Sequence, residues 1–488
     1  MKYIIAILFA IGSFISIVHW LNHFSLSPDS TNYITASENF VKHGSLFVYS
    51  NWPSKSFEPK IEPYTEYMPG LPIFTSVLFL FTDNPDTVML VMNSLCIVLV
   101  YFIVLMILYE LKLNDFLKII FLLFLTFFEP FRFIFSHFWT ETLFIIWSLL
   151  AVYFALKLIK EDNKKYLILG CIAVSFSAFI KMYGVFNCAF FLIPFVLHRK
   201  SFAKLALFIF ASSILVLIWY LRNEIIYGYF TSSHKIFQQF NSSNLLRPFK
   251  WTLFLLGNNN LANVWAILLL VVGLSPLWFY YRKKLNSNLD FKIWGLFLIG
   301  AVVNFTGIYF LSLVSSFDYL ESRLLAPVYI LCFLVFFMSI KILYEVVHPT
   351  VMQVKYLILA LPVILFAVNP AFEKEIDTNI DIHYAWEHEL WNEINQKGIV
   401  VNSSHYITEF NYIHQIYGNK PQRIIPDDSV FLNIGFLAEI LNKGKAPFVV
   451  LRNNELPYFH FDKIHNILGY KRAELENKHF TVYVKNNN

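Results

Sequence analysis

Long apolar stretches separated by short polar turns dominate the chain up to about residue 370. Most stretches hold roughly 18 to 24 residues with few charges, enough for a helix rising about 1.5 Å per residue to cross a hydrocarbon core about 30 Å thick. Backbone groups that face lipid need partners within their own segment, and the stretches lack the strict alternation of outer-membrane strands. The pattern therefore predicts an α-helical polytopic membrane protein with about eleven transmembrane helices.

The first predicted span is an uncleaved one, because no small-residue cleavage pattern follows it. The run 71–81 is too short to cross a bilayer and is typical of an interfacial or re-entrant helix. The predicted spans cover residues 3–24, 88–110, 116–135, 140–159, 166–182, 184–197, 203–221, 261–281, 291–313, 324–343 and 354–369.

Composition and charge agree with this interpretation. With 57% apolar residues, 15% charged residues and a mean hydropathy of +0.55, the chain is not a conventional soluble protein. Basic residues in short loops mark the cytoplasmic side, and here they gather in alternate turns. This predicts a multi-pass protein of the plasma (inner) membrane with a cytoplasmic N-terminus and an external or periplasmic tail. The basic turns hold Lys112 and Lys118, then residues 160–165, 199–204, 282–284 and 341–355.

Three longer polar segments all fall on the predicted outer side: residues 25–86, residues 223–260 and the tail. In the tail, strand-like runs at 398–404, 423–426, 447–451 and 480–485 alternate with helical patterns at 384–396 and 429–443. We therefore expect a membrane module over 1–370, with an external loop and juxtamembrane helices over 25–86, and a soluble α/β domain with a partly parallel sheet over 371–488. The tail has no glycine-rich phosphate loop, and we expect no nucleic-acid partner.

Two carboxylates stand near outer span ends. Asp29, just beyond the first span, is either a helix N-cap or a general base. Glu141, at the outer start of span 140–159, either favours the helix dipole or belongs to a site. His137 would share a helix face with Glu141 if that helix reached it, and the pair could help to hold a divalent metal. A third ligand is not evident, so no cofactor is assigned and a divalent metal stays open.

Basic residues are scarce at the predicted outer face: Arg132, Lys181, Arg222 and Arg323. They either snorkel to the membrane surface or bind an anionic head group, since guanidinium grips phosphate bidentately and ammonium acts as a point charge.

Glu66 and Tyr67 precede a proline-rich turn, Met68-Pro69-Gly70-Leu71-Pro72, at the start of the interfacial run. The prolines either only end a loop and start a helix, or create a rigid helix start whose free N–H groups position a substrate head group.

Six strings in a fixed order resemble the GT-C superfamily of membrane glycosyltransferases, in particular relatives of protein mannosyltransferases and of the lipid A aminoarabinose transferase. The resemblance covers roughly residues 1–370. The strings are SPDSTNY, EYMPGLPIF, HFWTETLF, AFIKMYG, WYLRNEIIYG and ESRLLAPVYI.

The resemblance implies a sugar donor on a polyprenyl phosphate and an inverting reaction in which Asp29 deprotonates the acceptor. It also implies that Glu141 is the second acid of the site and that Lys181, Arg222 or Arg323 binds the lipid phosphate. By the same resemblance, Glu66, Tyr67 and Asn223 are positions that bind substrate. One departure is that Met68 stands before Pro69-Gly70-Leu71, where the aminoarabinose transferases have Lys before Pro-Pro-Leu, which makes that donor class less fitting.

The sequence therefore predicts an inverting glycosyltransferase that moves a sugar from a polyprenyl-phosphate donor to a hydroxyl- or amine-bearing envelope molecule at the outer face of the plasma membrane. The acceptor is a glycan, a lipid or a protein, and membrane lipid surrounds the enzyme. The alternative is a transporter or flippase of lipid-linked sugars, although such proteins often carry midplane ionisable groups and inverted repeats. A third interpretation is an external binding or scaffold protein.

Overall fold

The computed structural model describes most of the membrane module and short parts of the tail. Two compact units emerge, the first made of Met1–Asn22, Thr65–Leu71 and Leu90–Thr378, and the second of His23–Tyr64, Pro72–Met89 and Asn379–Asn488. The described residues are 2–23, 25–26, 28–49, 61–65, 67–230, 271–278, 289–314, 322–347, 382–383, 393, 396–397, 407–408, 423–424, 448–452, 470–473 and 480–485.

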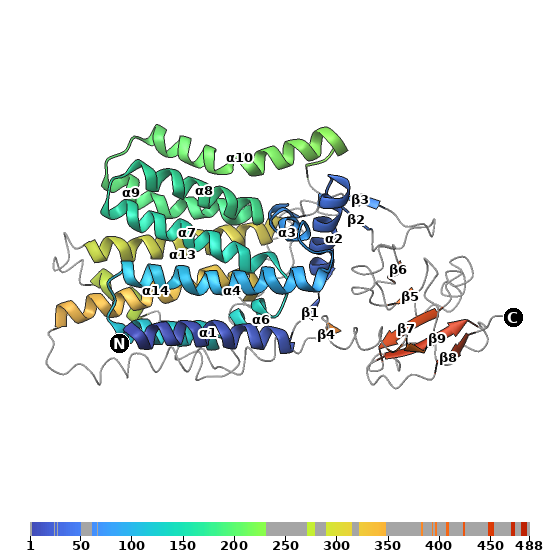
Figure 1. The fold of residues 1–488 in the computed structure, drawn as a ribbon. Helices are drawn as coiled ribbons and strands as arrows, with labels where there is room; N and C mark the ends of the chain where they lie inside the picture. The colour runs from blue at the N-terminus through green and yellow to red at the C-terminus, as the bar shows by residue number, and fades with distance from the viewer. Residues whose placement is uncertain are drawn as a thin grey trace. The chain divides into compact units, whose positions relative to one another are not determined.

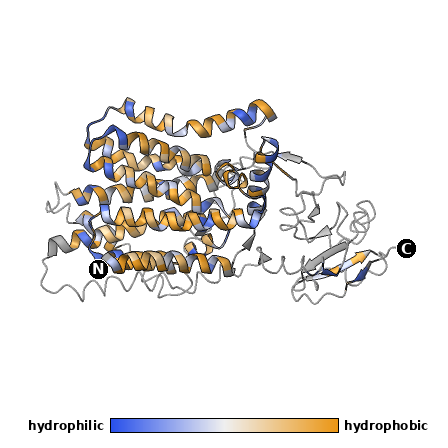
Figure 2. Ribbon diagram, in the orientation of Figure 1, coloured by the Kyte–Doolittle hydropathy of each residue, from blue (hydrophilic) through white to orange (hydrophobic). Residues whose placement is uncertain are grey.

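Six helices among the described residues are long and apolar enough to cross a membrane. They run along a common direction in Figure 1, and apolar residues predominate along them in Figure 2. Each matches a span predicted from the apolar pattern. They are α1 (Lys2–His23), α4 (Pro85–Glu110), α7 (Thr140–Lys160), α10 (Phe202–Tyr227), α13 (Leu289–Val314) and α14 (Ser322–Val347).

The predicted span 116–135 is wrong as a single helix. It consists of α5 (Asp115–Phe127) and α6 (Glu129–Phe135), which are separated by an extended residue, Phe128, with φ −73° and ψ 112°. Pro130 explains the break, because it has no N–H to continue the ladder of α5 and fits the first turn of a new helix.

A second break falls where two short spans were predicted. Helix α8 (Lys164–Ile180) ends at Lys181, whose backbone is extended, and a 3₁₀ helix, η1 (Met182–Phe191), and α9 (Leu192–Leu197) follow. The predicted interfacial run is α3 (Gly70–Phe79), which at about 1.5 Å per residue is only about 15 Å long and cannot span a bilayer.

Two predicted spans fall largely or wholly outside the described residues. Only 271–278, which is helical, is described within 261–281, and 354–369 is not described. The number of eleven spans therefore stays a prediction.

Aromatic side chains fill the space between α5, α6 and α14. The ring centroids of Phe124 and Phe333 lie 3.6 Å apart, and those of Phe128 and Tyr329 lie 5.5 Å apart. A buried hydroxyl, Tyr101 Oη, joins three helices by hydrogen bonds to Ser16 and Thr126. Dense packing of this kind holds the helix axes in fixed positions.

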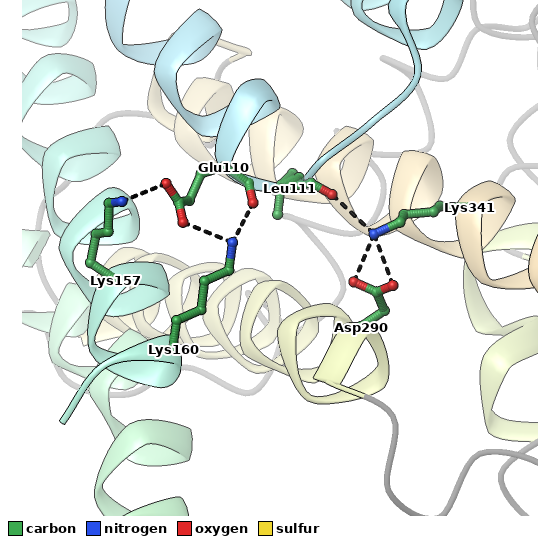
Figure 3. Close-up of polar contacts among 6 residues, drawn as sticks. All are labelled: Glu110, Leu111, Lys157, Lys160, Asp290 and Lys341. Carbon is green, nitrogen blue, oxygen red and sulfur yellow. Dashed lines mark hydrogen bonds and ion pairs between the residues drawn. The ribbon is translucent and has the colours of Figure 1, made fainter.

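A charged clasp, formed by Glu110, Leu111, Lys157, Lys160, Asp290 and Lys341, joins one set of helix ends (Figure 3). The Glu110 carboxylate accepts from the Nζ atoms of Lys157 and Lys160, both at 2.7 Å. Lys341 Nζ donates to the Leu111 carbonyl at 3.0 Å and to Asp290 at 2.8 Å. The clasp joins helix ends that were all predicted on the cytoplasmic side, so these contacts agree with the predicted alternation. The orientation of the termini stays a prediction.

In the second unit, α2 (Pro28–His43) packs on β2 (Phe47–Tyr49), which pairs antiparallel with β3 (Ile61–Pro63). Strand β1 (Ser25–Leu26) pairs antiparallel with β4 (Ile382–His383).

The tail contains a five-stranded sheet of order β6-β5-β7-β9-β8. Strand β5 is parallel to β6 and β7, and the other pairs are antiparallel, so the predicted partly parallel sheet is confirmed. The predicted strand 398–404 and most of both predicted helices lie outside the described residues, so the α/β class and the boundary at 370 stay predictions. The strands are β5 (Ile407–Thr408), β6 (Arg423–Ile424), β7 (Phe448–Arg452), β8 (Tyr470–Arg472) and β9 (Phe480–Lys485).

Candidate active site

A buried acid lies at the start of α7. Glu141 is in the first turn of this helix, and its side chain is 4% exposed. Thr140 donates to Glu141 Oε2 at 3.2 Å, and Lys181 Nζ donates to Oε1 at 2.6 Å. The first turn of a helix stabilises a carboxylate, but burial at the end of an apolar helix is costly unless a cation is close.

Lys181, the cation that pairs with Glu141, lies at the break between α8 and η1. Lys181 closes α8 with an extended backbone, φ −141° and ψ 126°, and its own N–H still bonds the Ser177 carbonyl. A lysine within a regular helix would follow the direction of its neighbours, whereas this turn sends the side chain to Glu141 of the adjacent α7. The break predicted around Lys181 is thus what makes the ion pair.

A second cation approaches from α14. The Arg323 guanidinium lies 4.7 Å from the ring of Trp139, the residue immediately before α7, and is within electrostatic range of Glu141. We call Glu141, Lys181 and Arg323 the acid–cation cluster. The cluster brings two cations beside one carboxylate, and the carboxylate is buried. Such a site favours an anion.

Two further side chains belong to this region. Tyr183 is 2% exposed, packs edge-on against Phe144 at 4.9 Å, and interacts electrostatically with Glu141 and Arg323. Its hydroxyl has no hydrogen-bond partner within the described part of the chain, and the same is true of the Thr142 hydroxyl. A buried donor of this kind is costly unless a ligand or water accepts from it, so both hydroxyls are suited to a polar ligand.

Sequence reasoning missed Trp139 and Tyr183. The chain contains 53 Phe, 27 Tyr and 11 Trp, so a single aromatic residue beside a charged one carried little signal.

The turn before α3 lies against the same break. A Cβ added at Gly70 would stand 2.8 Å from the Phe179 carbonyl and 2.9 Å from Ile180 Cα. Gly70 is therefore required for this close approach, and the turn packs against the two residues that precede Lys181. Tyr67, half-buried, is three residues before Gly70, whereas Glu66 lies outside the described residues.

Arg222 and Asn223 form a different cluster at the end of α10. The Arg222 guanidinium lies 4.7 Å from the ring of Trp219 and 5.1 Å from that of Tyr227, and it donates to Asn223 Oδ1 at 2.8 Å. Asn223 is fully buried and donates to the Phe230 carbonyl at 3.3 Å.

Another contact places the end of α10 beside the break. Tyr220 Oη donates to Met182 Sδ at 2.9 Å, and Met182 is the residue after Lys181.

Arg132 is the last of the four basic residues predicted at the outer face. Its guanidinium contacts His19 Nδ1 at 3.2 Å.

Asp29 lies in the second unit, in the first turn of α2, and is half-buried. Helix α2 begins at Pro28, so Asp29 is inside the helix and the N-cap interpretation is wrong for this residue. Pro28 suits the first position because its missing N–H has no partner to lose there. The role of Asp29 as a base stays a prediction.

The structure changes the interpretation of His137. Helix α7 begins at Thr140 and the preceding residue is extended, so His137 is not on the Glu141 face of this helix. Instead its ring stacks on Trp139 with centroids 3.9 Å apart, and its Nδ1 contacts the Phe133 carbonyl at 2.9 Å. Among the residues described, no group of three His, Cys, Asp or Glu side chains is arranged to hold a metal ion.

Comparison with solved structures identifies the fold. The crystal structure of ArnT from Cupriavidus metallidurans bound to undecaprenyl phosphate matches 100% of this chain and 99% of its own, with a TM-score of 0.60 and 10% identity. The apo structure of the same protein matches 98% and 97%, with a TM-score of 0.56 and 12% identity. No family model matches the chain, and neither does any curated protein. The chain therefore shares the fold of this ArnT over its whole length, and with six described helices long and apolar enough to cross a membrane it is an integral membrane protein.

Proposed function

We propose, from the shared GT-C fold, that this protein is an inverting glycosyltransferase that takes its sugar from a polyprenyl-phosphate donor. The acceptor is a hydroxyl- or amine-bearing molecule of the cell envelope, and the reaction takes place at the outer face of the plasma membrane. The similar ArnT structure holds undecaprenyl phosphate, which is the lipid that such a donor would release.

The acid–cation cluster is the observation that supports this proposal most directly. A polyprenyl-phosphate sugar is a phosphodiester with one negative charge, and the Lys181 ammonium and the Arg323 guanidinium are cations of the kinds that bind such a phosphate. The cluster lies at the ends of apolar helices, where a lipid phosphate also lies, with its polyprenyl chain in the hydrocarbon. Trp139 and Tyr183 add an aromatic wall beside the charges.

The charges also suit the chemistry. When the acceptor oxygen attacks the anomeric carbon, a new glycosidic bond forms and the bond from that carbon to the phosphate oxygen breaks. The phosphate leaves as a monoester with one more negative charge than the donor had. Two fixed cations are therefore more favourable to the transition state than to the bound donor, which is the requirement for catalysis.

In this mechanism Asp29 is the base. Its carboxylate takes the proton of the acceptor, on the face of the sugar opposite the phosphate, and the sugar inverts. A positioned base contributes about 10² to 10⁴ in rate. Glu141 holds Lys181 in place as the second acid, and Tyr67, Glu66, Arg222 and Asn223 are assigned to substrate binding around the site.

The proposal is tested with purified protein in lipid, labelled polyprenyl-phosphate sugar and an envelope extract as acceptor. Asp29→Asn should lose nearly all transfer while its thermal unfolding is unchanged. Asp115→Asn is the matched control, because Asp115 is also in the first turn of a helix but pairs with Lys118 at the predicted cytoplasmic side. Full transfer by Asp29→Asn would remove this carboxylate from the mechanism.

A direct binding measurement with undecaprenyl phosphate examines the cluster separately. Lys181→Met should weaken binding about tenfold or more, and Asp29→Asn should leave it within about twofold. Mass spectrometry of envelope glycans with and without the protein would then identify the sugar and the acceptor.

A further inference from the structure

Three polar side chains meet in the interior of the bundle, and we call them the polar lock. Asn187 Nδ2 donates to Ser148 Oγ at 2.9 Å and to Ser177 Oγ at 2.7 Å, and the two hydroxyls lie 3.2 Å apart. Ser177 is fully buried, Asn187 is 1% exposed and Ser148 is 6% exposed. Each of the three comes from a different segment, namely α7, α8 and η1.

The same three segments carry two members of the acid–cation cluster, Glu141 and Lys181, and the neighbouring Tyr183. Ser148 follows Glu141 by seven residues, two turns along one face of α7, and Ser177 precedes Lys181 by one turn of α8. Asn187 is four residues after Tyr183 in η1. The polar lock therefore lies directly beneath the cluster, one or two helical turns farther into the bundle.

Segment η1 needs outside support. A 3₁₀ helix of ten residues is unusually long, because its hydrogen bonds are poorer than those of an α-helix and runs above three or four residues are uncommon. Gly184 lets this segment approach α8 closely, since a Cβ there would overlap the Ser177 carbonyl group. The bonds from Asn187 to Ser148 and Ser177 hold η1 on both neighbours just beyond this point.

Stability alone does not explain the amide. Asn187 Oδ1 has no hydrogen-bond partner among the described residues, so part of the amide is buried at a cost. A leucine, which has the same number and branching of side-chain heavy atoms, would bury no unpaired polar atom in an apolar bundle. The side chain is better explained by what it fixes than by the stability it contributes.

We infer that Asn187 is a positioning residue, which through Ser148 and Ser177 fixes η1 and the extended turn at Lys181 so that the Lys181 ammonium is held against Glu141, ready for the donor phosphate. This inference rests on the proposed function. In this inference the polar lock sets the geometry of the acid–cation cluster, and Asn187 itself does not contact the substrate.

The test is a double-mutant cycle on purified protein, with labelled polyprenyl-phosphate sugar as substrate and binding of undecaprenyl phosphate as a second readout. Asn187→Leu should raise the KM for the donor and weaken binding of the lipid, each about tenfold, and it should also lower kcat, because a displaced Lys181 ammonium stabilises the departing phosphate less well. If Asn187 acts through Lys181, the double variant Asn187→Leu/Lys181→Met should be no worse than Lys181→Met alone, within about twofold.

The matched control is Asn304→Leu. Asn304 is also 1% exposed within a membrane helix, and its Oδ1 likewise lacks a partner among the described residues, but it lies on α13 and donates to its own helix at Gly300. This variant should keep the KM and the affinity of the wild type. Equal effects of Asn187→Leu and Asn304→Leu would indicate general packing and would overturn the inference.

An unchanged donor KM in folded Asn187→Leu, or losses that multiply in the double variant, would also overturn the inference. Should Asn187→Leu not fold, Ser148→Ala and Ser177→Ala take its place, since each removes one hydrogen bond of the polar lock. Each should raise the KM for the donor, and an unchanged KM in both variants would refute the inference. If Lys181→Met itself left the KM and lipid binding unchanged, the proposed function would fail instead.

Discussion

Lys181→Met removes the cation from a buried ion pair and is the sharpest perturbation available. The Glu141 carboxylate is 4% exposed, and its Oε1 lies 2.6 Å from Lys181 Nζ. Methionine has nearly the length of lysine but no charge, so the variant leaves the carboxylate buried among apolar side chains without its nearest partner. Removing one partner of a buried ion pair lowers the free energy of unfolding by much more than the intact pair contributed to it, because the remaining charge stays buried without a partner.

The size of the effect follows from these surroundings. Removing one partner of a buried ion pair costs about 3–5 kcal/mol. Because Arg323 remains within electrostatic range of Glu141, we expect the lower end, about 3 kcal/mol in the free energy of unfolding. Lys42→Met is the control, since Lys42 is 39% exposed and pairs with Glu38 one helical turn away. Because the Lys42 ammonium is in contact with solvent, although Glu38 is 10% exposed, we expect this variant to cost about 1 kcal/mol or less, well below the loss at Lys181.

The assay is reversible unfolding in mixed micelles, followed by circular dichroism, together with sugar transfer on the same samples. The double variant Lys181→Met/Glu141→Gln no longer buries an unpaired charge, so it should regain about 2 kcal/mol of the loss. It should not regain transfer, because the cation for the lipid phosphate is still missing. A double variant as unstable as the single one, or a single variant as stable as the wild type, would refute this reasoning.

Three further predictions concern the clasp, the turn before α3 and the second cation. Glu110→Gln should lower the free energy of unfolding by about 1–2 kcal/mol, since two lysines of α7 lose their partner. Transfer per folded molecule should be unchanged, because the clasp lies at the end of α7 opposite Glu141, and a loss of activity would contradict this. Gly70→Ala should lower the free energy of unfolding by about 1–3 kcal/mol and reduce transfer. Gly273→Ala is the control and should change neither property, because a Cβ there would meet only Val335 Cγ1 at 3.7 Å. Equal melting temperatures of the two variants would count against the close approach at Gly70. Arg323→Lys keeps the charge but loses the guanidinium that lies over the ring of Trp139, and kcat/KM should fall about tenfold. Unchanged kinetics would show that charge alone is needed.

Much of the helical framework followed from the sequence because lipid imposes a simple rule. A long apolar run must satisfy its own backbone, so α1, α4 and α7 begin and end close to where the run does. The break at Lys181 was predictable because a cation and a glycine interrupt an apolar run. The break at Phe128 was missed, since the run of phenylalanines hid the effect of Pro130.

The candidate site was only partly predictable. Glu141, Lys181 and Arg323 were each identified as charges near span ends, but which of them pair was not, because a hydropathy pattern contains no distances. Trp139 and Tyr183 were not identified at all, since both are ordinary in so aromatic a chain.

By itself the sequence determined that most of this protein lies in lipid, where most of its helices are, and which few charged residues lie near the ends of the spans. These properties depend on the residues of a single segment and the cost of placing them in lipid. Only the tertiary structure decided that Lys181 pairs with Glu141, that Arg323 lies over the ring of Trp139, and that Asn187 bonds the 3₁₀ segment to α7 and α8. Those contacts depend on how separate helices pack and on which residues of other segments meet each glycine, and neither is local in the chain.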